Sequence, residues 1–401
     1  MRTKFAIEDE VIQTAVGQNY GIPVRDLVFL PKGDISYAYR IICTDGTKYF
    51  LKLFDKSTRK GREGIRHLKF YLPVTRDMYD LGFCRNITYP IKNNRGDFAV
   101  DIGSAIIVLF NYIEGESLAD AYPFPRELLE KTAKSIARIH DLTGRMRFKT
   151  VRIENFDLFF LDGLERDLVL LERIREKNHA YVINDIIRDI GSLSKDMEED
   201  MGNHTDGNDT RTGGNGTAGA AQEGTTDGEK PEKFVDPEIR ALCEYVLPKK
   251  DRILDFMEQL YQYRDRIECD PYEMVLTHGD IWGGNLMLDP RGELYFTDWE
   301  SARIAPREAD LRHYLFEDFD FFLEKYKEES KGPVYLDPNL LGFYVYRSHL
   351  SNLANWISRM LHDNQSREQN QSDFECITLH CMERWDQVDQ KMQSSPLLRG
   401  F

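Results

Sequence analysis

Two short segments in the second half of the chain decide the fold class: 278–285, which reads HGDIWGGN, and 296–300, which reads FTDWE. Between them, short strand-like runs flank the turn sequence Asp-Pro-Arg-Gly at 289–292, which is the pattern of a β-hairpin. A hairpin at this point would bring Asn285 close to Asp298, with Asp280 on the loop just before it. The two segments therefore predict that two carboxylates and one amide converge on one site.

These side chains are of the types that phosphoryl transfer requires. A carboxylate must orient or deprotonate the attacking hydroxyl, and Asp280 is the candidate. Magnesium prefers hard oxygen ligands and needs few protein groups, so Asn285 and Asp298 suffice as its ligands. A cation must hold the phosphates from the other side, and we expect this to be Lys52, which lies on the predicted strand 48–54.

The rest of the chain divides into a strand-rich part and a helix-rich part. The first predicts a small antiparallel sheet with one basic helix at 59–81 and strands at 26–30, 36–43, 48–54, 87–91, 98–100 and 105–112. The second predicts helices at 126–142, 237–267, 339–361 and 373–392, with short strands at 273–277, 286–288 and 294–297. The sequence therefore predicts an α+β fold with two lobes, 1–112 and 113–401, that enclose a cleft.

One segment has a different composition from the rest. Residues 195–233 contain 10 acidic and 4 basic side chains and almost no apolar ones. Such a stretch cannot bury enough surface to offset the entropy of ordering it. We expect it to be a disordered insert within the second lobe.

Composition excludes several classes of protein. The 401 residues include 53 basic and 68 acidic side chains, for a net charge of −15, and 41% are hydrophobic. Global disorder is therefore excluded. The negative charge argues against a nucleic-acid binder held mainly by bulk charge, and it suits either solubility or a cationic substrate. The longest apolar run, 105–110, is too short to span a membrane. We therefore expect no membrane partner. Because the six cysteines form no C-x-x-C pair, we expect reduced thiols in a cytoplasmic protein.

The complete motif, His-Gly-Asp, four variable residues, Asn, and a second Asp after a hairpin, resembles the aminoglycoside phosphotransferase and choline kinase family. Asp310, twelve residues after Asp298, is similar to that family's structural aspartate, and 136–140 resembles its helix before the catalytic loop. Residues 49–53 and 305–311 are similar to the spectinomycin phosphotransferase branch. The resemblance implies a protein-kinase-like fold and a small-molecule kinase that uses Mg²⁺ and ATP, or GTP, to phosphorylate a hydroxyl of a small acceptor.

The resemblance also implies roles for residues of the first lobe. Glu63 would pair with Lys52, unless it makes only surface pairs. Gly33 and Ser36 would contact phosphate from the loop between the first two strands, unless this loop is an ordinary hairpin turn. The backbone between Leu109 and Tyr112 would hydrogen-bond the purine, as a hinge between the lobes.

Three other functions remain as alternatives. A protein kinase is disfavoured by Gly279, which replaces the arginine of His-Arg-Asp, and by the lack of an Asp-Phe-Gly motif. A catalytically idle nucleotide-binding module is disfavoured by the complete set of Lys52, Asp280, Asn285 and Asp298. A scaffold that recruits partners through its insert would lose its function if 195–233 were deleted, whereas a kinase would keep its activity.

Overall fold

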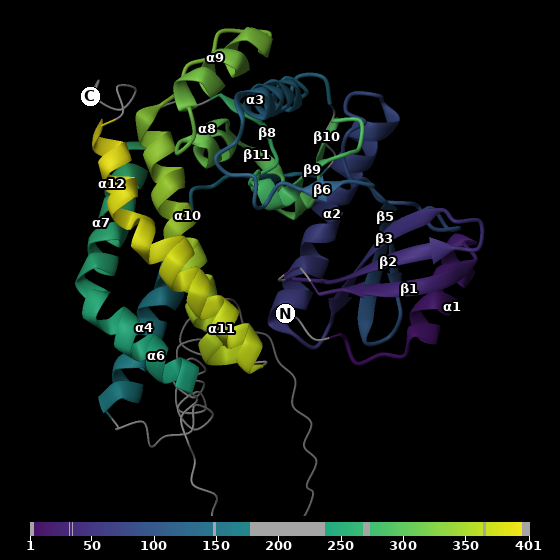
Figure 1. The fold of residues 1–401 in the computed structure, drawn as a ribbon, viewed down its shortest axis with the longest axis horizontal. Helices are drawn as coiled ribbons and strands as arrows, with labels where there is room; N and C mark the ends of the chain where they lie inside the picture. Colours follow the sequence, from purple (N-terminus) through teal and green to yellow (C-terminus); the bar gives the residue numbers. More distant parts are fainter. Residues whose placement is uncertain are drawn as a thin grey trace, which may run out of the picture. The chain divides into compact units, whose positions relative to one another are not determined.

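The chain falls into two compact units in a computed structural model that describes residues 4–31, 33, 35–146, 150–176, 237–267, 273–363 and 366–394. The first unit comprises 1–157, 256–349 and 384–401, and the second comprises 158–255 and 350–383. Figure 1 shows the elements of each unit along the chain. The predicted insert, 195–233, lies outside the described residues.

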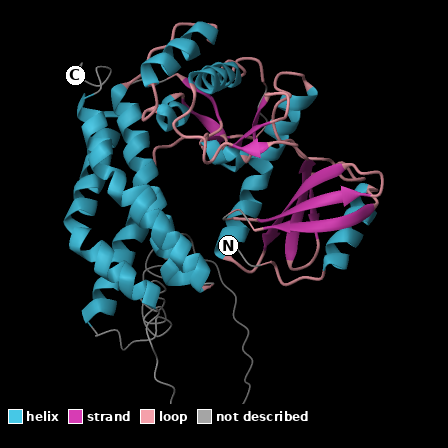
Figure 2. Ribbon diagram, viewed as in Figure 1, coloured by secondary structure: helices cyan, strands magenta, loops and turns pink. Residues whose placement is uncertain are grey.

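A five-stranded antiparallel sheet organises the N-terminal part of the first unit (Figure 2). Its strand order is β1-β2-β3-β5-β4, with bounds β1 Val24–Leu30, β2 Tyr37–Cys43, β3 Lys48–Asp55, β4 Ala99–Asp101 and β5 Ala105–Asn111. The strand expected at 87–91 is wrong, because this segment forms only isolated bridges through Ile87 and Pro90. A proline has no N–H to give to a ladder, so continuous pairing cannot form there.

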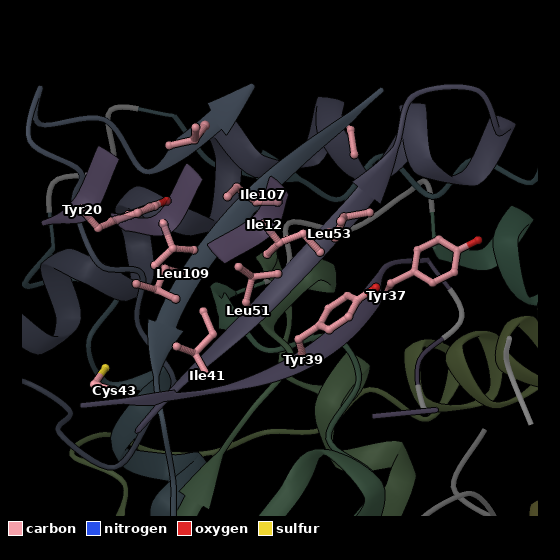
Figure 3. Packing of buried hydrophobic residues seen from close by; sticks show 13 residues of the cluster. Ile12, Tyr20, Tyr37, Tyr39, Ile41, Cys43, Leu51, Leu53, Ile107 and Leu109 are labelled. Carbon is pink, nitrogen blue, oxygen red and sulfur yellow. The ribbon is translucent and has the colours of Figure 1, made fainter. Parts of the chain in front are cut away.

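Helix α1 (Asp9–Tyr20), which the sequence analysis did not predict, covers one face of this sheet. Its side chains Ile12 and Val16 are fully buried and pack in one cluster with Leu51 and Leu53 of β3 (Figure 3). Because side chains alternate along a strand, Lys52 between them lies on the opposite face. The buried apolar face thus fixes the side of the sheet from which the lysine projects.

Helix α2 (Arg59–Asp80) packs on the face of the sheet that carries Lys52. It begins at the cap residue Thr58, whose hydroxyl accepts a hydrogen bond from Gly61 N at 3.0 Å. At Gly64 the helix lies so close to β3 that a Cβ would stand 2.8 Å from the ring of Phe54. Glycine is therefore required for α2 to lie directly against the strand of Lys52.

Two three-stranded sheets and several helices complete the first unit. One sheet has the order β10-β9-β6 and the other β7-β11-β8, with bounds β6 Glu116–Ser117, β7 Arg152–Ile153, β8 Met274–Thr277, β9 Leu286–Leu288, β10 Leu294–Phe296 and β11 Arg303–Pro306. The helices are α3 Arg126–His140, α8 Glu308–Leu311, α9 Phe319–Glu329 and α12 Trp385–Ser394. The predicted strands at 273–277, 286–288 and 294–297 are confirmed, whereas β6, β7 and β11, at two to four residues each, are too short for periodicity to reveal.

The second unit is helical among its described residues. It contains α4 (Phe160–Glu176), α6 (Pro237–Val246) and α11 (Arg367–Glu375), the start of α7 (Lys250–Ile267) and the end of α10 (Pro338–Ser358). Cys243 Sγ of α6 donates to Leu171 O of α4 at 3.7 Å, which joins these helices. The single helix expected at 373–392 is wrong, because a π-helical segment, Cys376–Cys381, separates α11 from α12. None of the described helices is both long enough and apolar enough to cross a membrane.

Candidate active site

The predicted hairpin brings Asp280, Asn285 and Asp298 together. Strands β9 and β10 pair antiparallel, and at their base Thr297 N donates to Asn285 O at 2.9 Å. The Asn285 amide in turn donates to both the backbone O and the carboxylate Oδ2 of Asp280, each at 2.9 Å. Asn285 is therefore paired with Thr297, the residue just before Asp298, and its side-chain amide holds the Asp280 carboxylate next to Asn285.

Lys52 reaches this group from the five-stranded sheet. Its Nζ donates to Asp298 Oδ1 at 2.8 Å and to Glu300 Oε1 at 2.7 Å. Burial lowers the pKa of Lys52, but the two carboxylates outweigh it and raise the pKa above its ordinary value. The structure thus joins four residues that lie far apart in the sequence, and it adds Glu300 as a second partner of the lysine.

The backbone at Asp298 explains how two carboxylates face one ammonium group. Asp298 has φ 60° and ψ 63° and leads into a single 3₁₀ turn, Trp299–Ser301. Left-handed backbone is uncommon outside glycine, although Asp and Asn tolerate it better than most residues, and it is often retained at functional sites. Burial raises the pKa of Asp298, but the Lys52 charge overcomes this and holds it below its ordinary value. Burial and the Asp298 charge raise the pKa of Glu300.

Asp280 remains accessible to a reactant, since 45% of its side-chain surface is exposed. Dehydration by the surrounding chain raises its pKa above the ordinary range, and Asp298 adds to this effect, whereas the charge of Arg312 opposes it. A carboxylate whose pKa is raised is a better proton acceptor near neutral pH. Asp280 therefore combines access with increased basicity.

Asp310, expected from the sequence to be a structural aspartate, holds the loop that carries Asp280. Its fully buried carboxylate accepts from His278 N at 2.8 Å and Gly279 N at 2.7 Å, and it contacts His140 Nε2 of α3 at 3.1 Å. His278 is buried as well, with its Nε2 donating to Thr297 O at 2.8 Å. These contacts tie the loop to the hairpin and to α3, so His278 has the contacts of a structural residue rather than of an exposed base.

Gly279 is the position at which this loop is most sensitive to substitution. It has φ +85°, and a Cβ there would stand 2.4 Å from Ser301 O. Gly46 has the same φ, but a Cβ there would meet nothing within 4 Å. We expect Gly46→Ala to cost about 1 kcal/mol for the left-handed backbone alone, and Gly279→Ala to cost about 1–3 kcal/mol more because of the clash.

Urea unfolding of both variants measures this difference, since the backbone conformation is matched and only the surroundings differ. Equal losses of stability would mean that Ser301 moves away freely and that the loop is not held as described.

Glu308, two residues before Asp310, predicts a dependence of stability on pH. Its side chain is buried and Oε1 accepts from Asp337 N at 2.8 Å, and burial raises its pKa to about 7. Because the folded state binds this proton more tightly than the unfolded state, whose pKa is about 4.5, protonation of Glu308 stabilises the folded state. This stabilisation is complete below about pH 4.5 and is lost as the pH rises through about 7. We expect a loss on the order of 2–3 kcal/mol between pH 5 and pH 8 from this group.

Glu308→Gln keeps the acceptor oxygen and removes the titration. The free energy of unfolding of wild type and variant, measured in urea at pH 5 and pH 8, gives the contribution of Glu308 as a double difference. A double difference of zero would place the pKa of Glu308 outside this window.

The structure does not bring the other predicted site residues into contact with Lys52. Glu63 is exposed on α2, where its charge acts on His67, and the hydrogen bonds of Lys52 within the described residues go to Asp298 and Glu300. Gly33, with φ 96°, lies in the β1–β2 connection, and the buried Ser36 lies just before β2. The pairing of Glu63 and the phosphate contacts of Gly33 and Ser36 remain predictions.

The predicted hinge begins inside the sheet. Leu109 is a fully buried residue of β5, and its carbonyl already accepts from Ile91 N at 2.7 Å. Tyr112 follows the end of β5, with Lys48 Nζ 5.7 Å from the centre of its ring. The carbonyl oxygen of Leu109 therefore has only its second lone pair left for a purine, which makes Tyr112 the more accessible end of the predicted hinge.

The hairpin supplies donors that fit a magnesium ion. Because the Asn285 amide nitrogen donates to Asp280, its oxygen is the atom left for a metal. Asp298 offers a carboxylate whose side chain is 44% exposed. Mg²⁺ takes one or two protein oxygens and completes its shell with water and phosphate, so this pair suits it. Within the described ranges, no group of three or more His, Cys, Asp and Glu side chains has the arrangement of a metal site.

Two contacts of the site were not predicted from the sequence. The pairing of Glu300 with Lys52 was not predicted. The signal that could have suggested it is the position of Glu300 two residues after Asp298, because a single turn can direct both side chains to the same side. Arg312 Nη2 donates to Gly279 O at 3.4 Å, and its charge acts on Asp280. Nothing in the sequence marks Arg312, because its position depends on how α8 packs under the loop.

Comparisons with known proteins support the resemblance stated from the sequence. A family model described as the phosphotransferase enzyme family matches residues 217–334, which include the whole hairpin motif. No curated protein sequence matches the chain. A structure of spectinomycin phosphotransferase with ADP and spectinomycin is 15% identical, with a TM-score of 0.58, and the match covers 92% of this chain and 94% of the other.

Other solved structures share the fold at similar identity. An amicoumacin kinase is 12% identical, with a TM-score of 0.50, over 98% of this chain and 96% of the other. An aminoglycoside 2′-phosphotransferase in complex with GDP is 14% identical, also with a TM-score of 0.50, over 96% of this chain and 99% of the other. At such identities the likeness establishes the fold. The resemblance is therefore confirmed: the chain matches the phosphotransferase enzyme family over residues 217–334 and has the protein-kinase-like fold of these phosphotransferases.

Proposed function

We propose that the protein is a small-molecule kinase that transfers the γ-phosphoryl group of ATP, or GTP, to a hydroxyl of a small acceptor. The observation that carries this proposal is the convergence of Lys52, Asp280, Asn285 and Asp298, which come from β3, a loop and a hairpin. Phosphoryl transfer depends mostly on positioning and charge neutralisation, and these four groups provide both.

The nucleotide side of the site would consist of Lys52 and the two metal ligands. Asn285 and Asp298 would hold Mg²⁺, which neutralises phosphate charge when bound. Lys52, held by Asp298 and Glu300 at 2.8 and 2.7 Å, is positioned to pair with the phosphates. Residues 1–112 would form the nucleotide-binding lobe. Gly33 and Ser36 would lie near the phosphates and the backbone of 109–112 would contact the purine. Glu63 would pair with Lys52 when the nucleotide is bound.

The acceptor side would centre on Asp280. Its carboxylate, fixed by the Asn285 amide, would orient the acceptor hydroxyl and take its proton. The hydroxyl oxygen then forms a bond to the γ-phosphorus, while the bond from that phosphorus to the β–γ bridging oxygen breaks and the nucleoside diphosphate leaves. The acceptor site would lie in the lobe 113–401, on the side of Asp280 away from Lys52.

An acceptor screen tests the proposal. Purified protein with Mg-ATP or Mg-GTP is incubated with amino alcohols, aminoglycosides, hydroxy acids, sugars and sugar phosphates, and products are detected by mass spectrometry. We expect at least one class to gain a phosphoryl group. Nucleotide binding without transfer to any of these acceptors would support the idle module instead, and transfer to protein side chains alone would support a protein kinase.

A further inference from the structure

A group of arginines in the first unit lies around one buried carboxylate that the proposed chemistry does not use. Glu154 follows β7, and its side chain is only 1% exposed. Its Oε2 accepts from Arg303 Nη1 of β11 at 3.2 Å and pairs with Arg347 Nη1 of α10 at 2.9 Å. Its Oε1 accepts from the backbone N–H groups of Asn155 and Phe156, at 3.1 and 3.0 Å. Glu154 is thus a fixed anchor that orients two guanidinium groups.

A third arginine joins the group without a carboxylate of its own. Arg152 lies on β7, which pairs with β11, and its side chain has no hydrogen bond or ion pair within the described part of the chain. Dehydration lowers its pKa, the positive charges of Arg303 and Arg347 lower it further, and Glu154 and Glu63 oppose the shift. Three guanidinium groups therefore share one buried carboxylate, that of Glu154, and even with the exposed Glu63 counted this leaves an excess of positive charge.

The excess charge is accessible to solvent. Arg303 and Arg347 keep 19% and 17% of their side-chain surface exposed, and Arg152 is only partly buried. A planar guanidinium that is held on one edge by a carboxylate still has donors on its other edges. We call Arg152, Arg303 and Arg347 the arginine cluster.

The arginine cluster adjoins the loop of Asp280. Arg303 Nε donates to Ser301 O at 3.1 Å. This carbonyl oxygen also lies close to Gly279, where a Cβ would stand 2.4 Å from it. The charge of Arg303 also acts on Arg312, which donates to Gly279 O. The arginine cluster therefore interacts with two residues, Ser301 and Arg312, that border the loop of the proposed proton acceptor Asp280.

We propose that the acceptor carries an oxyanion, either a carboxylate or a phosphate ester, which Arg152, Arg303 and Arg347 bind while Asp280 receives the acceptor hydroxyl. This proposal rests on the proposed kinase function and names its substrate class. Arginine binds both oxyanions through two parallel N–H···O bonds, so the shared chemistry is an anion with at least two equivalent oxygens.

The charge of the cluster favours an anion over a cation. A cationic acceptor would meet three like charges against the two carboxylates of Glu154 and Glu63, and repulsion between partly buried charges is stronger than in bulk water. An anion would instead relieve the repulsion that the arginines exert on one another. The net charge of −15, read from the sequence as a possible sign of a cationic substrate, therefore does not describe the surroundings of Asp280.

Arg152 is the residue to substitute, because no described contact depends on it. We expect Arg152→Gln to raise the KM for an anionic acceptor about ten- to hundredfold, the usual value of a hydrogen bond to a charged group. Arg152→Lys should recover part of the loss, since it keeps the charge but not the fork. Arg25→Gln, which removes an exposed arginine of β1, is the matched control and should leave KM unchanged.

Paired acceptors distinguish the two oxyanions. Hydroxy acids are compared with their amides, and sugar phosphates with the free sugars, at saturating Mg-nucleotide. A preference for one anionic member that Arg152→Gln abolishes supports the proposal and identifies the group. Equal use of both members of every pair, or a preference for amino alcohols, would overturn the proposal and leave the kinase function standing.

A second measurement does not need turnover. Sodium sulfate is titrated in the presence of saturating Mg-ADP, with sodium chloride at matched ionic strength, and the melting temperature is recorded. We expect sulfate to stabilise wild type more than Arg152→Gln, with Arg25→Gln behaving as wild type. If no acceptor is phosphorylated but this difference is present, the kinase function fails and the anion site stands. Identical responses in all three proteins would refute the anion site.

Discussion

Replacing Asp280 by asparagine is expected to reduce kcat by about a hundred- to ten-thousandfold, the usual contribution of general-base catalysis. Asparagine has nearly the same shape and can still accept from Asn285, which donates to this side chain at 2.9 Å. What it cannot do is take a proton. Single-turnover phosphorylation of the acceptor found in the screen measures the loss.

The same variant has a second, independent readout. Because the surroundings raise the pKa of Asp280, the rate for wild type should fall as the pH drops through that raised value, where the carboxylate becomes protonated. This acidic limb should be absent in Asp280→Asn. Nucleotide affinity should stay within about twofold, since the interaction is made with the acceptor. Full activity in the variant would contradict the role given to Asp280.

Asp298→Asn should have an effect of similar size for a different reason. The substitution keeps a residue that tolerates the left-handed backbone at φ 60°, so the turn should persist. It removes the charged metal ligand, and with it several kcal/mol of charge stabilisation. We expect kcat/KM for the Mg-nucleotide to fall by about a hundredfold or more.

Magnesium titrations of nucleotide binding separate this effect from a folding defect. For Asp298→Asn the dependence of nucleotide affinity on magnesium should weaken, while the melting temperature without ligands changes little because Glu300 still pairs with Lys52. Asp26→Asn, at an exposed position of β1, serves as the control. An unchanged response to magnesium in Asp298→Asn would remove Asp298 from the metal site.

The parts of the site that could be predicted from the sequence are those determined by local pattern. The hairpin of β9 and β10 follows from its turn residues and strand lengths, so the meeting of Asn285 with Asp298 could be inferred. The bond from Lys52 to Asp298 spans 246 positions and was not predicted, since the resemblance gave Glu63 as the partner of Lys52. Local pattern determines β-turns and alternation, whereas contacts between distant segments depend on packing.

The errors have the same origin. The strand expected at 87–91 has suitable residues, but Pro90 cannot donate to a ladder. Helix α1 has an apolar side that becomes apparent only when Ile12 and Val16 meet Leu51 and Leu53 in the core. The arginine cluster was missed for the same reason, since Arg152, Arg303 and Arg347 stand on three separate elements and belong to no common motif.

The bonds of Lys52 have a consequence for the order in which ligands bind. Its ammonium group neutralises Asp298, the residue assigned to the metal. A nucleotide that arrives without metal would draw Lys52 away and leave Asp298 facing phosphates of like charge. A metal that arrives alone would displace Lys52 and leave its ammonium group with Glu300 only. Each ligand therefore pays a penalty that the other removes, and the two should bind with positive thermodynamic linkage, each raising the affinity for the other by the same factor.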